Sequence, residues 1–313
     1  MVPIANTKEN KKALPFAVYY WTVVFLAAAG LADSVYLSIS HYRVYTDITY
    51  SSFCAISKAI NCDTISQSPY SILVGLPVPI WGVAGYLCFL LLLACAKTPQ
   101  ADKKRIWSLL YLVSWVFSLY SLILAYISTT LIHSYCIMCI VSYAINFLLL
   151  FYSRMIRKRF DSGPFVTGLA ADLLFLWNRK ALAGGLLTSL LTVLILTWTF
   201  YPNYWHPDEP ELATTINSGL TPDGHPWIGA ENPKIVITEY TDYQCFQCKK
   251  MHFFLRQLVA EHPDNIRLVH RHFPMDHEYN PIVKEPFHVG SGKMALLAIY
   301  AAARDRFWEM NDM

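Results

Sequence analysis

Six of the eight cysteines form three pairs whose spacing suits thiol–disulfide chemistry. Two pairs are C-x-x-C motifs, Cys136-Ile-Met-Cys139 and Cys245-Phe-Gln-Cys248. Residues three apart at the start of a helix have Cα atoms about 5–6 Å apart, a separation that a disulfide can span. The first cysteine of such a motif lies where the helix dipole and free N–H groups favour a thiolate. We therefore expect both motifs to take part in redox exchange.

A C-x-x-C motif can also be a structural disulfide or half of a zinc site. Zinc needs two further ligands at suitable spacing, and none lies beside either motif. Five histidines in the C-terminal region follow no standard metal-site spacing, and we expect them to be surface residues: His262, His270, His272, His277 and His288. Redox exchange without a bound metal remains the favoured interpretation, because perturbed thiols at helix ends usually mark function.

The third pair, Cys54 and Cys62, is eight residues apart. A straight helix would separate these cysteines by about 12 Å, which is too far for a disulfide. A loop or a broken helix would bring them together, or let each meet a different partner. We expect this pair to relay electrons between the two C-x-x-C motifs, with a structural loop disulfide as the alternative. Cys88 and Cys95 lie in an apolar run and receive no role.

The elements that must position these cysteines lie mostly in lipid. Of the 313 residues, 55% are hydrophobic and only 15% are charged, whereas soluble domains carry about a quarter charged residues. A disordered chain and a single soluble globule are both excluded, and a net charge of +3 is too small to indicate nucleic-acid binding. A membrane span needs about 20 apolar residues. Five segments meet this length: 13–39, 78–96, 106–132, 135–153 and 181–201.

The distribution of Lys and Arg predicts the orientation of these spans. Thirteen basic residues fall before the first span and in the connections 97–105 and 154–180, against Arg43 and Lys58 on the other side. Because cytoplasmic loops are enriched in Lys and Arg, we expect a cytoplasmic N-terminus and an external segment after residue 201. All three cysteine pairs then face the oxidising compartment, where disulfides persist. With no transit peptide, a bacterial inner membrane is expected.

The external segment differs in character from the spans. Residues 202–233 are rich in Pro, Asp, Glu, Asn and Gly and indicate a linker. Strands are expected at 235–240 and 266–272, and helices from Cys245 to Leu258 and over 292–310, which together predict a small α/β domain. The predicted division is a four-helix bundle at 1–160, a fifth span with its basic connection at 161–203, a linker at 204–233 and the α/β domain at 234–313.

Residues 13–153 resemble the vitamin K epoxide reductase family in its bacterial form. The resemblance rests on SVYLSISHY (34–42), the Cys54-x7-Cys62 loop, CDTISQSPYSILVGLPVPIWGVAGY (62–86) and CIMCIVSYAIN (136–146). It implies a four-helix bundle around a quinone, of the ubiquinone or menaquinone class. It also implies that Cys139 faces the quinone while Cys136 exchanges with the loop pair. Ser68 and Tyr143 match residues that could hydrogen-bond a quinone oxygen, and Trp81 could line the pocket.

The external domain resembles the DsbA-like branch of thioredoxin folds. This resemblance rests on IVITEYTDYQCFQCKKM (235–251), RHFPMD (271–276) and ALLAIYAAARDRFWEMND (295–312). The cis-proline loop, closing hairpin and final helix of that pattern are absent before Met313, so we expect a truncated domain that is unstable alone. Its first strand would then keep one edge unpaired.

Together these features predict an all-α membrane protein with an α/β thioredoxin-like outer domain. We expect a quinone-dependent thiol oxidoreductase that generates disulfides. Electrons would pass from periplasmic thiol proteins or a thioredoxin-like donor through Cys245/Cys248 and Cys54/Cys62 to Cys136/Cys139, and then to quinone. The alternative is a metal-binding or structural multi-pass membrane protein with an inactive, truncated redox domain.

Overall fold

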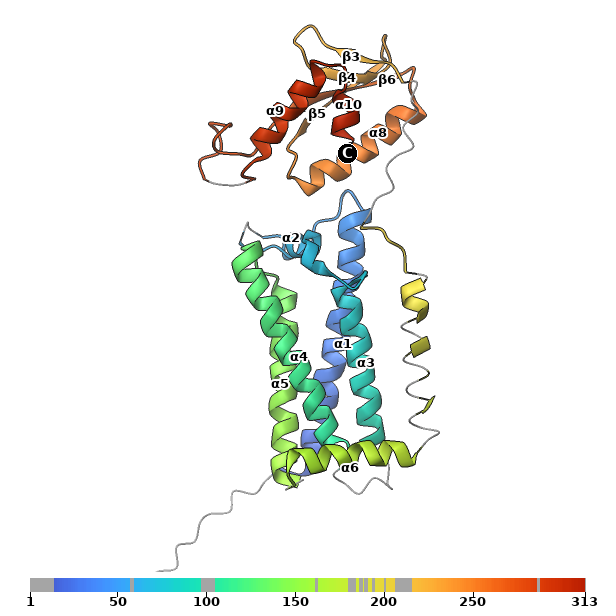
Figure 1. Cartoon of the computed structure of the whole chain (residues 1–313), viewed down its shortest axis with the longest axis vertical. Coiled ribbons are helices and arrows are strands. Elements are labelled where there is room, and N and C mark those ends of the chain that lie inside the picture. Colours follow the sequence, from blue (N-terminus) through green and yellow to red (C-terminus); the bar gives the residue numbers. More distant parts are fainter. Residues whose placement is uncertain are drawn as a thin grey trace, which may run out of the picture. The chain divides into compact units, whose positions relative to one another are not determined.

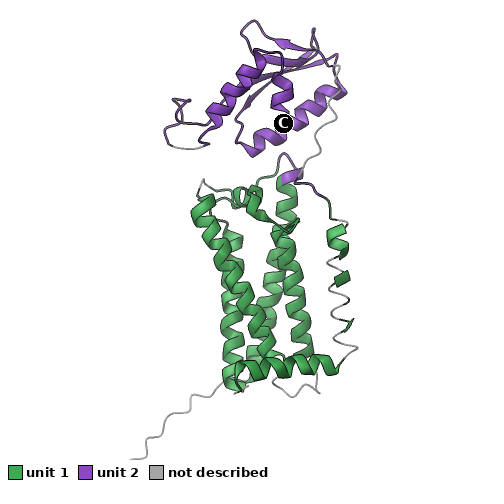
Figure 2. Ribbon diagram, viewed as in Figure 1, with its two compact units in different colours: residues 1–44, 50–202 green, residues 45–49, 203–313 purple. Residues whose placement is uncertain are grey.

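The chain separates into two compact units (Figure 2), Met1–Val44 with Tyr50–Pro202 and Tyr45–Thr49 with Asn203–Met313. The structure is a computed structural model. It describes residues 14–56, 59–96, 105–160, 163–179, 184–185, 188, 191–192, 195–199, 201–205, 216–285 and 288–312. The first unit is a bundle of helices, and the second is built on a small sheet with helices (Figure 1).

Among the described residues, four helices of the first unit are long and apolar enough to cross a membrane. They are α1 (Phe16–Thr46), α3 (Val78–Ala96), α4 (Trp107–Ile127), which continues as a π-helical turn (Ser128–Ile132), and α5 (Ile137–Phe160). These helices confirm the first four apolar segments expected from the sequence, with shifts of up to seven residues at their ends. About half of the fifth predicted span, 181–201, falls outside the described residues, and Lys8, Lys11, Lys12 and the connection 97–104 fall outside them entirely.

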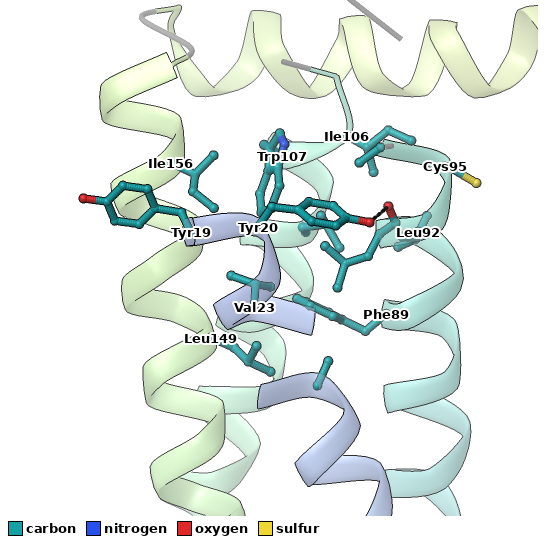
Figure 3. Close-up of a cluster of buried hydrophobic side chains, with 14 of the residues drawn as sticks. Tyr19, Tyr20, Val23, Phe89, Leu92, Cys95, Ile106, Trp107, Leu149 and Ile156 are labelled. Atoms are coloured by element: carbon teal, nitrogen blue, oxygen red, sulfur yellow. Dashed lines mark hydrogen bonds between the residues drawn. The ribbon is translucent and has the colours of Figure 1, made fainter. Parts of the chain in front are cut away.

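Apolar and aromatic side chains pack between the four helices near one end of the bundle (Figure 3). Tyr20 and Val23 of α1 meet Phe89 of α3, Trp107 of α4 and Leu149 of α5 in this core. The Tyr20 hydroxyl donates a hydrogen bond of 3.0 Å to the carbonyl of Leu93, so the polar end of this buried ring is satisfied.

Small residues let the helices approach closely in the other half of the bundle. A side chain at Gly30 of α1 would overlap the Tyr86 ring of α3, and one at Gly82 would overlap Ser34. On α4, Ser118 donates to the carbonyl of Asn146 on α5 at 3.2 Å. Contacts of this kind hold helices together in lipid. Lipid tails are as apolar as the side chains, so burying apolar surface between helices gains little free energy there.

A short helix that the sequence did not predict, α6 (Phe165–Asn178), anchors the start of α4. The buried carboxylate of Asp172 accepts hydrogen bonds from the backbone N–H groups of Ile106, Ser108 and Leu109 at 2.7, 2.9 and 3.1 Å. A helix leaves its first N–H groups without partners, and a negative charge there is favourable. Asp172 therefore caps α4 from another segment of the chain.

The connection between α1 and α3 contains a helix and a hairpin. Helix α2 (Cys62–Gln67) begins after Asn61, whose side chain accepts from the N–H groups of Asp63 and Thr64. Strands β1 (Ile72–Leu73) and β2 (Leu76–Pro77) then form a two-stranded hairpin. Its turn places both Val74 and Gly75 at positive φ, which Gly accepts without strain. This folded connection brings Cys62 back to the bundle.

The second unit has a four-stranded sheet in the order β3-β4-β6-β5. Its strands are β3 (Ser218–Leu220), β4 (Pro226–Gly229), β5 (Ile235–Thr241) and β6 (Ile266–His272), with β5 and β6 parallel and joined by α8 (Phe246–Glu261). Ile228, Leu255, Val259, Ile266 and Leu268 form its core. The predicted strands at 235–240 and 266–272 are confirmed, and β5 lies at the edge of the sheet as expected.

Two expectations for this unit are wrong. Residues 202–233 are not all linker, because β3 and β4 lie within them and the sheet starts before residue 234. These strands have only three and four residues. They are stabilised because β4 pairs with β6, and the local composition does not reveal that pairing. The predicted helix over 292–310 is two helices, α9 (Ser291–Ala302) and α10 (Phe307–Asn311), separated by Asp305 in the left-handed conformation.

Candidate functional site

The first cysteine pair is a disulfide that lies inside the bundle unit. Cys54 and Cys62 are bonded, with Cα atoms 5.6 Å apart, and both are almost fully buried. The loop that carries them pairs with the segment before α5: the Asn61 N–H donates to the Tyr135 carbonyl at 2.9 Å, and the Tyr135 N–H donates to Ala59 at 2.8 Å. These backbone bonds bring Cys62 close to the second pair.

The second pair stands at the start of α5. Cys136 immediately precedes the helix, and its Sγ accepts a hydrogen bond of 3.1 Å from the backbone N–H of Cys139. Cys136 is buried together with Cys54 and Cys62, and Cys139 packs against this group. The structure therefore brings four of the six predicted redox cysteines into one cluster, with the helix N-terminus favouring a thiolate at Cys136.

A cavity of about 500 Å³ lies against this cluster. Cys62, Cys136 and Cys139 border it, and its walls are mainly apolar side chains from α1, α2, α3, α4 and α5: Leu37, Ile65, Val78, Phe117, Leu124 and Ile140. This volume falls in the range of small-molecule sites, which are mostly apolar with a few polar groups. The cavity thus fits a planar apolar ring placed beside two thiols.

Ser68 and Tyr143 both border the cavity, as does Trp81. The Ser68 hydroxyl donates to the Ile65 carbonyl at 2.8 Å and keeps lone pairs that can accept a hydrogen bond. The Trp81 indole donates to the Leu73 carbonyl at 2.9 Å, which fixes its ring at the cavity wall. The residues present can therefore offer both hydrogen bonds and flat apolar contact to a quinone.

A further group of polar side chains at this cavity was not predicted from the sequence. The Tyr86 hydroxyl donates to Asn146 at 2.6 Å, and the Asn146 amide donates to Ser121 at 2.9 Å. All three side chains border the cavity. A signal was available, because Cys139, Ser142, Tyr143 and Asn146 recur at the three- and four-residue intervals of one helix face within an apolar segment.

The third pair lies in the other unit, at the start of α8. Cys245 caps this helix and accepts a hydrogen bond of 3.2 Å from the Cys248 N–H. Hydrogen bonding from Cys248 lowers the pKa of the Cys245 thiol to about 7, although burial opposes the shift. The same interaction raises the pKa of Cys248. Cys245 is therefore the thiolate of this pair and Cys248 its protonated partner.

The expectation that the five C-terminal histidines lie at the surface is wrong for His270. Its side chain is fully buried, and its Nδ1 lies 2.8 Å from Glu239, which also faces His252 at 3.1 Å. The His252 ring in turn contacts Asp312 at 2.8 Å. Within the part of the chain that the structure describes, no group of three or more His, Cys, Asp or Glu could hold a metal ion.

Comparison with known families agrees with this division into two parts. Residues 21–154 match the vitamin K epoxide reductase family, and residues 221–287 match a thioredoxin family. No curated protein matches the chain. The first match covers all four candidate membrane helices except the ends of α1 and α5, and the second covers β4, β5, α8 and β6. The chain therefore joins a vitamin K epoxide reductase family domain to a thioredoxin-like domain, and it is a membrane thiol oxidoreductase.

Proposed function

We propose that this membrane thiol oxidoreductase generates disulfides and transfers the electrons to a quinone of the ubiquinone or menaquinone class. The observation that carries the proposal is the single cavity bordered by Cys62, Cys136 and Cys139. Two cysteine pairs that can exchange with one another thus lie beside a space suited to an apolar ring. A purely structural bundle would not need this arrangement.

The first step takes electrons from a partner protein. A dithiol of a periplasmic thiol protein or of a thioredoxin-like donor reduces the Cys245–Cys248 disulfide and is itself oxidised. The Cys245 thiolate then attacks the Cys54–Cys62 disulfide, and Cys248 resolves the mixed disulfide that results. Two electrons move and one S–S bond replaces another. The lowered pKa of Cys245 supports its role as the attacking sulfur.

The second step occurs within the cluster. The loop dithiol reduces the Cys136–Cys139 disulfide through a mixed disulfide with Cys136, which is packed against Cys54 and Cys62. Cys139, which borders the cavity together with Cys62 and Cys136, is proposed as the thiol that faces the acceptor. A bound quinone supplies an acceptor there for two electrons and two protons. Ser68 and Tyr143 are proposed to orient its oxygens by hydrogen bonds, and Trp81 to hold its ring.

The proposed location is a bacterial inner membrane, with a cytoplasmic N-terminus and a periplasmic thioredoxin-like domain. The asymmetry of Lys and Arg supports this orientation. A basic cluster, Arg157, Lys158 and Arg159, ends α5 on the side proposed as cytoplasmic. The three cysteine pairs would then share the compartment in which new disulfides persist.

The test is thiol trapping of the full-length protein in lipid, with a small dithiol as reductant and a soluble quinone as acceptor. We expect wild-type Cys136 and Cys139 to be oxidised when quinone is added. Cys139→Ala should lower quinone reduction by at least 10³-fold, because the thiol beside the cavity is lost. The matched control is Cys88→Ala, which removes a thiol from α3 outside the cavity and should keep wild-type activity. If added quinone leaves the oxidation state of Cys136 and Cys139 unchanged in the wild type, the proposal is refuted.

A further inference from the structure

Asp33 is the only Asp or Glu within the four candidate membrane helices. Its side chain lies on α1 and is only 5% exposed. A carboxylate in such surroundings is costly unless it is paired, and ionisable residues inside membrane segments usually serve a function. The structure thus places one acidic side chain within these four helices, and the proposed electron path does not use it.

The contacts of Asp33 point toward the cavity. Its Oδ2 accepts a hydrogen bond from the Ser142 hydroxyl on α5, and Ser142 borders the cavity. Its Oδ1 is buried and has no hydrogen-bond partner among the described residues. No Lys, Arg or His within the described chain forms an ion pair with it. A merely structural acid would be expected to satisfy both oxygens.

The thiols of the second pair lie within electrostatic reach of this carboxyl. Asp33 interacts with Cys136 and Cys139 at the start of α5 and with Tyr86 on α3. Ser142 follows Cys139 by three residues, so both lie on one face of α5. The titratable groups that face Asp33 are therefore the two thiols from α5 and the Tyr86 phenol from α3, with the Ser142 hydroxyl between Asp33 and the cavity.

Formation of the Cys136–Cys139 disulfide releases protons as well as electrons. Two S–H bonds break and one S–S bond forms, while a quinone takes up the two electrons and two protons and becomes a quinol. In a mainly apolar cavity, each proton needs a group that can accept and release it. Asp33 has the required chemistry, and its hydrogen bond to Ser142 connects it to the cavity.

We propose that Asp33 relays a proton during thiol oxidation, receiving it from the Cys139 side and returning it to the cavity through the Ser142 hydroxyl. The inference rests on the proposed quinone-dependent function and adds a positioning residue for its proton transfer. Asp33 acts through Ser142, and it ends each cycle in the protonation state in which it began. Its loss should slow proton transfer while leaving the cysteine pairs able to form their disulfides.

The test compares Asp33→Asn and Asp33→Glu in the full-length protein in lipid. Asn keeps a side-chain oxygen for Ser142 but cannot carry a proton, so we expect oxidation of Cys136 and Cys139 by a soluble quinone to slow by about 10²-fold or more. The pH dependence of this step should disappear in Asp33→Asn and return in Asp33→Glu. Asp172→Asn is the matched control. It removes another buried carboxylate, which lies on α6 at the start of α4, and it should keep the wild-type pH profile.

A second readout needs no quinone. The infrared difference spectrum between the dithiol form and the disulfide form, prepared with a small dithiol and a small disulfide, should contain a carboxyl band that Asp33→Asn removes. An unchanged rate and pH profile in Asp33→Asn would overturn the inference, as would an unchanged infrared band. If wild-type protein reduces no quinone, the proposed function fails, and the infrared band still decides whether Asp33 exchanges a proton with the thiols.

Discussion

At the scale of single residues, the two thiols of the outer C-x-x-C motif differ because of their places on α8. Cys245 lies at the end of the helix and receives the N–H of Cys248, which stabilises a negative charge on its sulfur. Cys248 lies within the first turn, and the charge that forms on Cys245 makes a second thiolate unfavourable. The motif thus contains one nucleophilic thiolate, Cys245, and one protonated thiol, Cys248, which resolves the mixed disulfide.

This difference predicts the pH dependence of alkylation. In the fully reduced protein, the rate at Cys245 should rise with pH and reach half of its plateau near pH 7, because only the thiolate reacts. Cys248 should stay unreactive through this range. Cys248→Ala keeps the backbone N–H but removes the side-chain hydrogen bond that lowers the pKa of Cys245 most, so the midpoint for Cys245 should move upward. Iodoacetamide labelling followed by peptide mass spectrometry measures both sites, and equal reactivity of the two thiols at pH 7 would contradict the prediction.

At the scale of elements, local sequence predicts those helices and strands that depend mainly on their own residues. The apolar run at 78–96 is long enough to require a membrane helix, and α3 has these same bounds. The run at 266–272 likewise becomes β6. In contrast, β4 depends on pairing with β6, and α6 is held by the contact of Asp172 with the start of α4. Such elements depend on distant partners, and the sequence predicted only a linker around β4 and only a basic connection around α6.

The candidate site shows the same division between local and distant determinants. The C-x-x-C motifs and their thiolates follow from spacing and helix position, which the sequence displays. The cavity requires α1, α3, α4 and α5 to pack side by side, and no local pattern fixes which residues border it. Asn146 and Ser142 were therefore missed, although their spacing from Cys139 places them on the same face of α5.

A buried ionic network joins four elements of the thioredoxin-like unit. Glu239 of β5 faces His252 of α8 and His270 of β6, and Asp312, next to α10, faces His252. Burial raises the pKa of Glu239, but hydrogen bonds from the two histidines outweigh it and lower the pKa to about 2. Burial lowers the pKa of His252, and hydrogen bonds to Asp312 and Glu239 outweigh this and leave it raised.

These shifts predict a pH window for the stability of this unit. The stabilisation from Glu239 is present above its unfolded pKa of 4.5 and is lost as pH falls toward about 2. The stabilisation from His252 is present below its unfolded pKa of 6.5 and is lost as pH rises through the higher folded value. We therefore expect the greatest stability between about pH 4.5 and 6.5, measured by hydrogen exchange in β5 and α8 after correction for intrinsic rates.

Substitution of His252 tests whether this residue sets the upper pH limit of the stability window. His252→Gln should lower the protection of β5 and α8 by about 1–3 kcal/mol at pH 5.5, because Glu239 and Asp312 lose a charged donor. In this variant, the protection of β5 and α8 should also no longer decrease as the pH rises above 6.5. His262→Gln, at an exposed position after α8, is the control and should resemble the wild type. A wild-type profile that stays flat from pH 5 to 9 would show that His252 is not protonated in the folded unit.

At the scale of the whole molecule, the three cysteine pairs are divided between two units. Cys54/Cys62 and Cys136/Cys139 lie in the bundle with the cavity, and Cys245/Cys248 lies in the thioredoxin-like unit. The bundle therefore contains everything that the proposed quinone step requires, and the second unit contributes a half-buried thiol of lowered pKa for exchange with proteins. A fusion of this kind keeps donor and acceptor on one chain, which raises their effective concentration for each other.

This division predicts that the two half-reactions can be separated by Cys245→Ala. A small dithiol can reach the bundle without the second unit, so quinone reduction driven by it should stay within about twofold of the wild type. A reduced substrate protein is oxidised by the Cys245–Cys248 disulfide, which Cys245→Ala cannot form, so its oxidation should fall by about 10²-fold or more. Cys54→Ala is the informative counterpart, because it breaks the relay inside the bundle and should block oxidation of the protein substrate while a dithiol that reaches Cys136 directly still reacts.

Oxygen-independent quinol formation and trapping of mixed disulfides measure the two reactions in the same sample. If Cys245→Ala oxidises the protein substrate at the wild-type rate, electrons enter the bundle without the fused domain, and the order of the proposed relay is wrong at its first step.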